Sequence, residues 1–344
     1  MNGLTLAINP AVTDLPQVEE VLSWLPEYRS ASLPGRWLVL ADIHANWHAL
    51  AAVLRHARGR YQGIQFQGDL VGYGPRPVEC VDLFKRARLE EWSPGNHDLG
   101  VVGQLTRHTA GAGTRVGADA KTTWETHRAA LGEFPSIWKW FDEVVSGACV
   151  DPVHLLHREC FVTRVHGMPK DPLNHYVFPS DWANTLENLT VVGNAWTKLQ
   201  GNPENATWAG HRNGRDSTPG YLLAGHTHMP VLMQIEPGQS RLRVLEIPIG
   251  QAVSVDRGAF LINPGSVGQP RDGDPRAAYA ILDVNKSTIE FDRTAYDVQA
   301  VVNELVEKKY PPELSTILHS GRIPRTEADY ESVYERREGR LVPR

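Results

Sequence analysis

The feature that most constrains the fold of this 344-residue chain is a repeated order of apolar run, polar cluster and helical segment. Residues 37–41 form a continuous apolar run, which is typical of a strand buried on both faces. A polar cluster at residues 42–44 follows directly, and residues 47–58 then show helical spacing of apolar side chains. Further predicted elements follow at residues 64–66 (strand), 77–87 (helix) and 89–92 (strand). Such alternation predicts a sheet with parallel neighbours joined by crossover helices.

Beyond this region, a helical insert precedes a strand-rich region. We expect the insert over about residues 101–141, with residues 116–131 its clearest part. Residues 168–220 are predicted to hold a helix and a long loop, which is either a lid over a pocket or an inert surface excursion. Further strands are predicted at residues 143–148, 160–165, 221–224, 231–235, 241–247, 259–262 and 278–282. Two closing helices are predicted at residues 297–309 and 312–318.

The predicted domain organisation is one large domain with two short flanking segments. Residues 36–322 contain no Ser/Gly linker and no low-complexity run, so we expect one domain there although the length suggests about two. Residues 1–35 form an N-terminal extension with an amphipathic helix around residues 18–25. Residues 323–344 form a tail, whose last four residues resemble what thrombin leaves of an engineered cleavage site.

Composition narrows the class of protein and its location. The net charge of -5 argues against broad electrostatic binding to nucleic acid. The three cysteines show no CxxC spacing, which argues against a zinc knuckle or a disulfide framework and fits a reducing cytoplasm. The N-terminus lacks the pattern of a signal peptide, and the longest apolar runs are too short to span a bilayer.

Five polar clusters carry side chains of the kinds that bind metals, each just after a predicted strand. They are Asp42-Ile43-His44, Gly68-Asp69, Gly95-Asn96-His97-Asp98, Val165-His166-Gly167 and Gly225-His226-Thr227-His228. In an open α/β sheet, ligands bind at the carboxyl ends of the strands, so the clusters are expected to meet at one rim. Asp42 and Asp69 are 27 residues apart, as are Asp69 and Asn96. Each step matches one strand–helix–strand unit of ~30 residues.

Taken singly, these clusters are also ordinary turn sequences, since Gly-Asp and Asp-x-His occur in many loops. Their joint occurrence favours a metal site. Carboxylate, amide and imidazole ligands suit manganese, iron, zinc, nickel or cobalt, and the absence of thiolates argues against a structural cysteine-type zinc site. Seven candidate ligands are too many for one tetrahedral ion, but they suit two divalent ions that share one carboxylate.

The order DxH, GDxxGxG, GNHD, HG and GHTH resembles the calcineurin-like metallophosphoesterase superfamily. The match is closer to its bacterial and archaeal predicted-phosphodiesterase branch, which is similar to the small YfcE-like enzymes. Four stretches carry this closer match, namely residues 68–75, 166–172, 263–275 and 294–297. The resemblance covers about residues 36–322, with gaps, and implies a four-layer αββα sandwich of two mixed β-sheets flanked by helices.

The resemblance also implies a role for each candidate residue. The first metal would be held by Asp42, His44, Asp69 and His228, and the second by Asp69, Asn96, His166 and His226. A hydroxide between the ions would attack the phosphate in line, and His97 would act as general acid on the leaving oxygen. The alternative for His97 is a histidine that only orients Asn96.

Two departures from the family pattern concern this site. Many members carry a second Asp, which pairs with the acid histidine, where this chain has Gly72. Either Asp98 or a backbone carbonyl is then expected to orient His97. Ala45 stands where Gly is usual, which predicts a narrower site. Substrate binding is further predicted for Ser266, Arg271 and Tyr73. The alternative for Ser266 is a purely structural role in its tight turn.

The sequence thus predicts a two-metal phosphodiesterase that acts on a small phosphorylated, nucleotide-like substrate. Alternatives are a phosphomonoesterase or protein phosphatase, and a non-catalytic metal-binding scaffold on the same fold. A nuclease would require a basic groove, which the acidic balance disfavours. Membrane attachment is not expected, and assembly into a homo-oligomer is left open.

Overall fold

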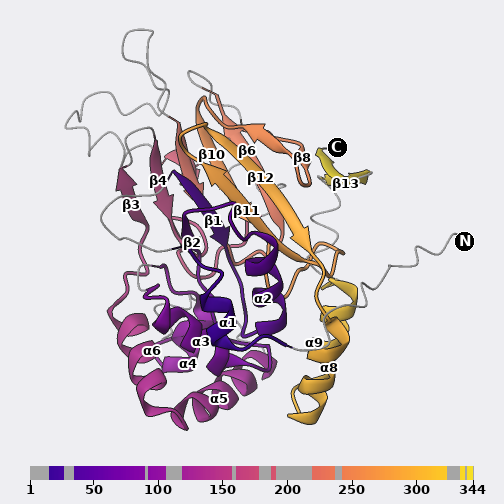
Figure 1. Ribbon diagram of the computed structural model, residues 1–344. Helices are drawn as coiled ribbons and strands as arrows, with labels where there is room; N and C mark the ends of the chain where they lie inside the picture. Colours follow the sequence, from indigo (N-terminus) through magenta and orange to yellow (C-terminus); the bar gives the residue numbers. More distant parts are fainter. Residues whose placement is uncertain are drawn as a thin grey trace, which may run out of the picture.

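Two large mixed β-sheets packed face to face form the centre of the molecule (Figure 1). The computed structural model describes residues 15–26, 35–89, 92–105, 118–156, 160–177, 187–190, 219–236, 242–323, 334–337 and 339–343. Within these residues helices flank the sheets, so the predicted fold class is confirmed.

The first sheet has the strand order β2-β1-β11-β12-β9. Its strands are β2 (Gly63–Phe66), β1 (Arg36–Leu40), β11 (Ala277–Asp283), β12 (Thr288–Thr294) and β9 (Ala252–Ser254). Strands β1 and β2 run parallel, as predicted, while β11 lies antiparallel to β1. The polar segments that follow β1 and β2 therefore leave the sheet at the same edge.

The second sheet has the order β3-β4-β5-β10-β6-β7. Its strands are β3 (Val153–Leu156), β4 (Phe161–Arg164), β5 (Gly220–Leu223), β10 (Ala259–Pro264), β6 (Pro230–Ile235) and β7 (Leu242–Val244). The three strands β4, β5 and β10 are mutually parallel neighbours. Their carboxyl ends give the second sheet its own rim of loops.

Side chains alternate between two cores along β1. Trp37 and Val39 lie in the core between the sheets, with Tyr221 and Phe260 of the second sheet. Leu38 and the other even-numbered apolar residues of β1 belong to the core under the helices. The strand is therefore buried on both faces, as its unbroken apolar run predicts.

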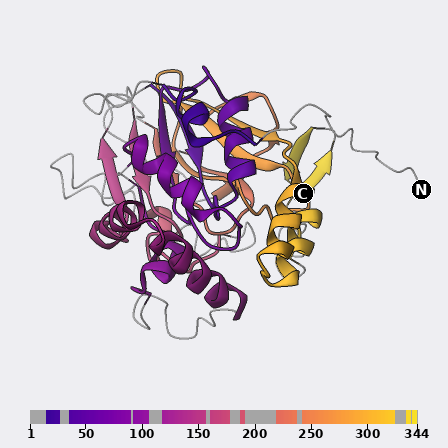
Figure 2. The same cartoon turned by 60° about the horizontal axis from the view of Figure 1, so that its bottom comes forward.

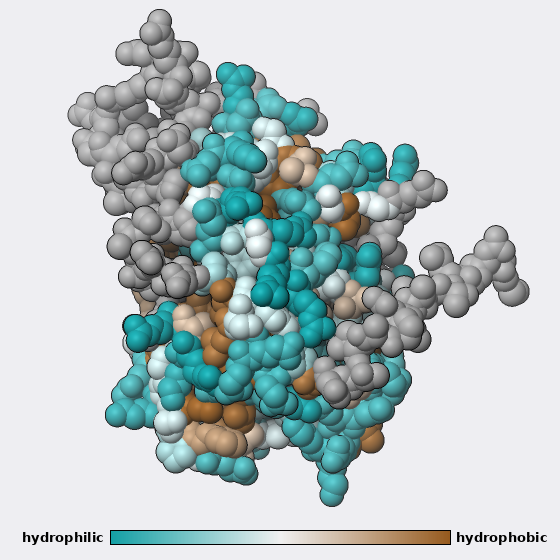
Figure 3. Space-filling model, viewed as in Figure 1, coloured by the Kyte–Doolittle hydropathy of each residue, from teal (hydrophilic) through white to brown (hydrophobic). Residues whose placement is uncertain are grey.

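Helices cover the first sheet and gather at one end of the molecule (Figures 1 and 2). They are α1 (Val18–Leu22), α2 (Trp47–His56), α3 (Pro77–Arg86), α4 (Asn96–Val102), α5 (Ala118–Gly132) and α6 (Pro135–Gly147). A separate pair, α8 (Val298–Glu307) and α9 (Pro312–Ser320), packs around its own small core. Figure 3 shows that the face viewed there is mainly hydrophilic, with brown areas chiefly at the helical end.

Several local predictions differ from the structure. The strand predicted at residues 241–247 is divided into β7 (Leu242–Val244) in the second sheet and β8 (Ile247–Pro248) in a smaller sheet. The strand predicted at residues 143–148 is wrong, because residues up to Gly147 belong to helix α6. Ile137, Phe141 and Val145 recur every four residues on its buried side, so helical packing overrides the β-branched pair in the sequence. For the strand predicted at residues 89–92, the structure describes only residues 89 and 92, and neither belongs to a strand. Residues 90–91 lie outside the described part of the chain.

The flanking segments are described in part. Strands β13 (Tyr334–Arg337) and β14 (Arg340–Pro343) form a small sheet with β8 (Ile247–Pro248), and Leu341 is buried in the core between the large sheets. The origin of the last four residues stays a prediction. Most of residues 168–220, the predicted lid or loop, lies outside the described residues. In the part of the chain that is described, no helix is long and apolar enough to cross a bilayer.

Candidate metal centre

The loops at the carboxyl ends of the parallel strands converge where the two sheets meet. The N–H of Asp42, after β1, donates to the carbonyl of Gly68, after β2, at 3.0 Å. In the second sheet, Gly225 N–H donates to the carbonyl of His166 at 2.7 Å. The His226 N–H then reaches across to Asp42 Oδ1 at 3.1 Å, which joins the two rims. Strand topology therefore brings residues 184 positions apart into one site.

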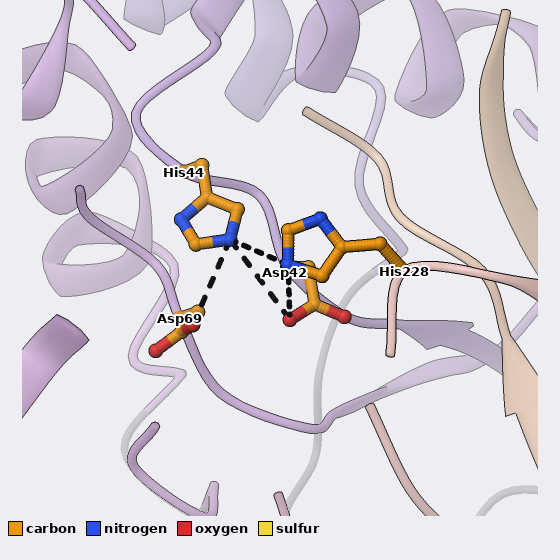
Figure 4. Close-up of side chains that lie close together, drawn as sticks. All are labelled: Asp42, His44, Asp69 and His228. Carbon is orange, nitrogen blue, oxygen red and sulfur yellow. Dashed lines mark hydrogen bonds and ion pairs between the residues drawn. The ribbon is translucent and has the colours of Figure 1, made fainter. Parts of the chain in front are cut away.

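One group of four buried side chains forms the first half of the site (Figure 4). Each of Asp42, His44, Asp69 and His228 offers one ligand atom, and these atoms lie within 4.8 Å of one another. The two Nε2 atoms of His44 and His228 are 3.0 Å apart. His228 Nε2 lies 3.4 Å from Asp42 Oδ1, and His44 Nε2 lies 3.6 Å from Asp69 Oδ2.

A second group shares Asp69 with the first. Asp69, His166 and His226 place one ligand atom each within 4.8 Å of one another. His166 Nε2 lies 3.5 Å from Asp69 Oδ2 and 3.2 Å from Asn96 Oδ1. The same carboxylate oxygen, Asp69 Oδ2, therefore faces a histidine of each group. The seven ligands expected from the sequence all lie together here.

Hydrogen bonds to the backbone show that this pocket suits cations. The Nδ1–H groups of His44, His166 and His228 donate to main-chain carbonyls at 3.1, 2.6 and 2.7 Å, respectively. In a neutral imidazole, the other nitrogen is then an acceptor with its lone pair free. Burial would lower the pKa of His166, but the charge of Asp69 outweighs it and raises that pKa to about 9. Burial lowers the pKa values of His44 and His228, so these two rings are neutral and direct two lone pairs at each other. Such repulsion is relieved by a cation between the groups, and backbone-bonded imidazoles are the usual metal-ligating form.

The backbone of the site is held in an unusual conformation. Positive φ angles occur at seven non-glycine residues in and beside the two groups: Asp42, His44, Ala45, Asp69, Tyr73, His226 and His228. Residues other than glycine rarely adopt this left-handed region, and such strain concentrates at functional sites. Glycine adopts the positive φ seen at Ala45 without strain, which fits the glycine that the family pattern leads one to expect there.

The two carboxylates of the centre respond differently to their surroundings. Burial raises the pKa of Asp42 to about 8, with the charge of His166 acting against that rise. Burial acts in the same direction on Asp69, but the charge of His166 outweighs it and holds the pKa of Asp69 below its ordinary value. Buried carboxylates of this kind are stabilised in the ionised form when metal ions bind beside them.

Comparison with known proteins identifies the family to which this geometry belongs. A family model described as calcineurin-like phosphoesterase matches residues 35–230, which is more than half of the chain. The chain belongs to the calcineurin-like phosphoesterase family. A second model, for the calcineurin-like phosphoesterase superfamily domain, matches residues 187–287.

Three relatives extend this comparison. The uncharacterized protein MJ0912 of Methanocaldococcus jannaschii is 29% identical over 291 residues, which cover 83% of this chain and 97% of that protein. The crystal structure of a metallophosphoesterase from Sphaerobacter thermophilus is similar with 29% identity and a TM-score of 0.61, covering 84% of this chain and 100% of that one. The crystal structure of hypothetical protein PH1004 from Pyrococcus horikoshii OT3 shares the fold with 17% identity and a TM-score of 0.55, covering 83% and 98%.

Membership in the calcineurin-like phosphoesterase family makes the protein a phosphoester hydrolase that depends on divalent metal ions. The clustered carboxylates and imidazoles are the candidate ligands in this chain. The narrower assignment to the YfcE-like branch stays a prediction.

His97 lies beside the candidate ligands of this calcineurin-like centre rather than among them. Its backbone N–H donates to Asp69 Oδ1 at 2.9 Å, and its ring centroid lies 4.8 Å from that of His44. It is the second residue of α4, so this cluster begins a helix and is not the ordinary turn that was the alternative. Burial lowers the pKa of His97 to about 4.

Among the described residues, neither Asp98 nor a backbone carbonyl orients the ring of His97, although one of the two was predicted to do so. The carboxylate of Asp98 instead accepts the backbone N–H groups of Asp69, Val71 and Gly95 at 2.8, 3.2 and 2.9 Å. It fixes the loop that carries the shared Asp69. The ring of His97 is contacted by Trp124 on α5, whose indole N–H donates to His97 Nδ1 at 2.9 Å. The sequence pattern contains no signal for this pair, because the two residues lie on different helices.

The three predicted substrate residues have different environments. The hydroxyl of Ser266 donates to the carbonyl of Asp42 and accepts the N–H of Gln269, both at 2.8 Å, so it is engaged in the fold rather than directed at a substrate. Arg271 is buried beside the centre, and its guanidinium donates to Gln269 Oε1 at 3.1 Å. Tyr73 is partly buried, with its ring centroid 4.3 Å from that of His97.

A further aromatic residue beside the centre, Tyr176, was not predicted from the sequence. Its side chain is 37% exposed, and its ring centroid lies 4.2 Å from that of His226. It belongs to the segment after His166, in which no metal-ligand spacing is present. The position of Tyr176 puts an accessible aromatic face at the edge of the centre.

Proposed function

We propose that the protein is a two-metal phosphodiesterase for small, nucleotide-like substrates. The observation that carries this proposal is one carboxylate oxygen, Asp69 Oδ2, placed between two groups of ligands. It lies 3.6 Å from His44 Nε2 and 3.5 Å from His166 Nε2, and both distances exceed a normal hydrogen bond. A shared carboxylate is what two neighbouring cations require.

The proposed ligands divide between two ions. Asp42, His44, Asp69 and His228 would hold one, and Asp69, Asn96, His166 and His226 would hold the other. Two bound divalent ions would supply Lewis-acid stabilisation of phosphoryl charge and hydroxide at neutral pH. Oxygen and imidazole donors suit manganese among other first-row ions.

The residues around the centre support a diester as substrate. Arg271 is a buried guanidinium beside Asp42, and no ion pair joins it to a carboxylate of the described residues. Such a group binds phosphate oxygens through charge-assisted hydrogen bonds. A phosphodiester carries one negative charge, and one guanidinium matches it.

His97 would serve the leaving oxygen as a hydrogen-bond or proton donor. It is the residue next to the candidate ligand Asn96, yet its ring is not part of either ligand group. The exposed ring of Tyr176 at the edge of the centre suits a planar, nucleotide-like group in the substrate. Free thiols at Cys80, Cys149 and Cys160 fit a cytoplasmic location.

The experiment is a paired hydrolysis assay. Protein stripped with a chelator and reloaded with manganese should hydrolyse bis(p-nitrophenyl) phosphate faster than p-nitrophenyl phosphate, and the stripped protein should hydrolyse neither. A preference for the monoester would contradict the diester assignment. Inactivity toward both compounds with two ions bound per chain would contradict the esterase function and favour a scaffold.

A further inference from the structure

The contact between Trp124 and His97 fixes where the proton of the imidazole lies. An indole N–H is only ever a donor, so the Nδ1 atom that it meets at 2.9 Å must be an acceptor. A neutral imidazole with an accepting Nδ1 carries its proton on Nε2. The two rings meet edge to face, with centroids 5.5 Å apart and planes at 84°. Both side chains are buried, which keeps water from replacing the indole.

Two glycines leave the space for this pair. A Cβ atom added at Gly72 would lie 2.3 Å from His97 Nδ1, and the backbone there has a φ of +93°. A Cβ atom added at Gly100 would lie 2.4 Å from the indole ring of Trp124. Neither distance is possible for a real side chain, so the indole and the imidazole occupy the room that larger residues would take.

Helix α5 supports the same arrangement from a second position. His127, one turn after Trp124, accepts the N–H of Gly72 at its Nδ1 atom at 3.0 Å and contacts the carbonyl of Gly74 through Nε2 at 2.8 Å. It therefore fixes the loop at Gly72, which lies next to the ring of His97. One helix thus fixes both the loop and the ring.

The polarity of this contact is opposite to that of a histidine paired with a carboxylate. A carboxylate accepts from Nδ1–H and stabilises a ring protonated on both nitrogens. Here a ring protonated on both nitrogens would set its Nδ1–H against the indole N–H, two donors 2.9 Å apart. The indole therefore favours the neutral ring with its single proton on Nε2.

We propose that Trp124 is a positioning residue that holds His97 in the Nε2–H tautomer, so that His97 acts on the substrate as a neutral hydrogen-bond donor. This inference rests on the proposed function in one respect: the Nε2–H group is taken to face the leaving oxygen of a phosphate ester. The Nε2–H bond is not broken. The departing oxygen takes its proton from water, and the hydrogen bond from His97 stabilises the negative charge that forms on that oxygen.

The direct test is the tautomer itself. In zinc-loaded protein with ¹⁵N-labelled histidine, long-range ¹H–¹⁵N spectra distinguish a protonated from an unprotonated ring nitrogen. The signals of His97 are assigned by their loss in His97→Ala. We expect an unprotonated Nδ1 and a protonated Nε2. A protonated Nδ1 in the wild-type protein would overturn the proposal, whatever the protein hydrolyses.

A variant tests the role of the indole. Trp124→Phe keeps an aromatic ring but removes the N–H, so we expect mixed tautomers at His97. We also expect a kcat lower by about 10- to 100-fold, a KM within about twofold and unchanged metal content. Trp47→Phe is the matched control, because it removes a buried indole N–H that donates to the Pro16 carbonyl at 2.9 Å. It should leave the tautomer and kcat as they are.

Three results with these variants would count against the proposal. They are an unchanged tautomer and kcat in Trp124→Phe, equal losses in Trp124→Phe and Trp47→Phe, and loss of metal from Trp124→Phe alone. If Trp124→Phe does not fold, the wild-type spectrum still decides the tautomer. If no phosphate ester is hydrolysed, the proposed function is contradicted. The tautomer assignment is then still decided by the spectrum of the wild-type protein.

Discussion

The histidines of this site differ in what contacts their Nδ1 atoms. In His44, His166 and His228, Nδ1–H donates to a main-chain carbonyl, so that Nε2 is the atom that faces the candidate metal centre. In His97, Nδ1 accepts from an indole, which leaves a proton on Nε2. Identical side chains a few ångströms apart thus offer opposite functions. Under the proposed function, the partner on the far side of each ring decides whether that ring binds metal or donates to substrate.

The two kinds of contact also have different structural origins. The carbonyls belong to Gln67 and Val71, in the loop after β2 that carries Asp69, and to Gln269, in the loop after β10. The indole belongs to a helix outside both sheets. The three candidate ligand histidines are therefore fixed by loops of the sheets, and His97 is fixed by a helix packed beside them.

The largest effect should follow from changing the residue common to both ligand groups. Asp69→Asn removes the shared charge, so we expect metal content to fall and activity to drop by more than about 1,000-fold. Metal analysis and diester hydrolysis measure the two effects. Asp283→Asn, at the end of β11 away from the site, is the control and should keep both. Full metal occupancy in Asp69→Asn would contradict the assignment of Asp69 as the ligand shared by the two ions.

His97→Ala tests the division between the two kinds of histidine. Because its ring lies outside both ligand groups, we expect both metals to stay bound. The kcat should fall by about 10²–10⁴-fold with the loss of the donor. His154→Ala, on strand β3, is the control variant and should keep its activity. If His97→Ala instead lost one metal, His97 would belong with the ligands.

Gly72→Ala tests the same division with a smaller perturbation. The added methyl group would meet His97 Nδ1 at 2.3 Å, and alanine is strained at a φ of +93°. We expect kcat to fall by roughly 10-fold, because His97 must move, while metal content is unchanged. Alanine at Gly59, where φ is also positive but the space is open, controls for backbone strain. Equal kcat losses in the two variants would show that the contact with His97 is not responsible.

The smallest effect concerns an ion-pair network that includes neither the candidate ligand histidines nor His97. Glu304 on α8 accepts hydrogen bonds from Arg76 at 2.7 and 2.8 Å and lies 2.8 Å from His48 Nε2. Burial alone would raise the pKa of Glu304, but His48 and Arg76 outweigh it and lower the pKa to about 2. Because the unfolded chain binds its proton at higher pH, this stabilisation is present above about pH 4.5 and is lost as pH falls toward 2.

Glu304→Gln should therefore lower the free energy of unfolding by about 1 kcal/mol at pH 7 and by less at pH 3. Urea unfolding of metal-free wild-type and variant protein at both pH values measures the difference. Metal affinity and the tautomer of His97 should not change. A difference that is as large at pH 3 as at pH 7 would contradict the assigned cause.

The sequence by itself determined the elements whose signals are local. The apolar run of β1 and the polar residues directly after it are neighbours in the chain, so periodicity and strand-end chemistry predict both. The sheets then bring Asp42 and His228 together as that prediction requires. Strand β12 was missed because Arg293 on its buried face interrupts the alternation, and its partner Asp272 is identified only by the folded structure.

Tertiary structure alone decided how His97 is held. Gly72 in the sequence shows that the usual carboxylate is missing, but it does not indicate what replaces it. The replacement, Trp124, lies 27 residues after His97 on a helix whose own pattern only indicates packing. A metal ligand can be predicted from its side chain and its place at a strand end. The proton on an imidazole depends on the hydrogen-bond partner of its other nitrogen, which here is supplied by packing between helices.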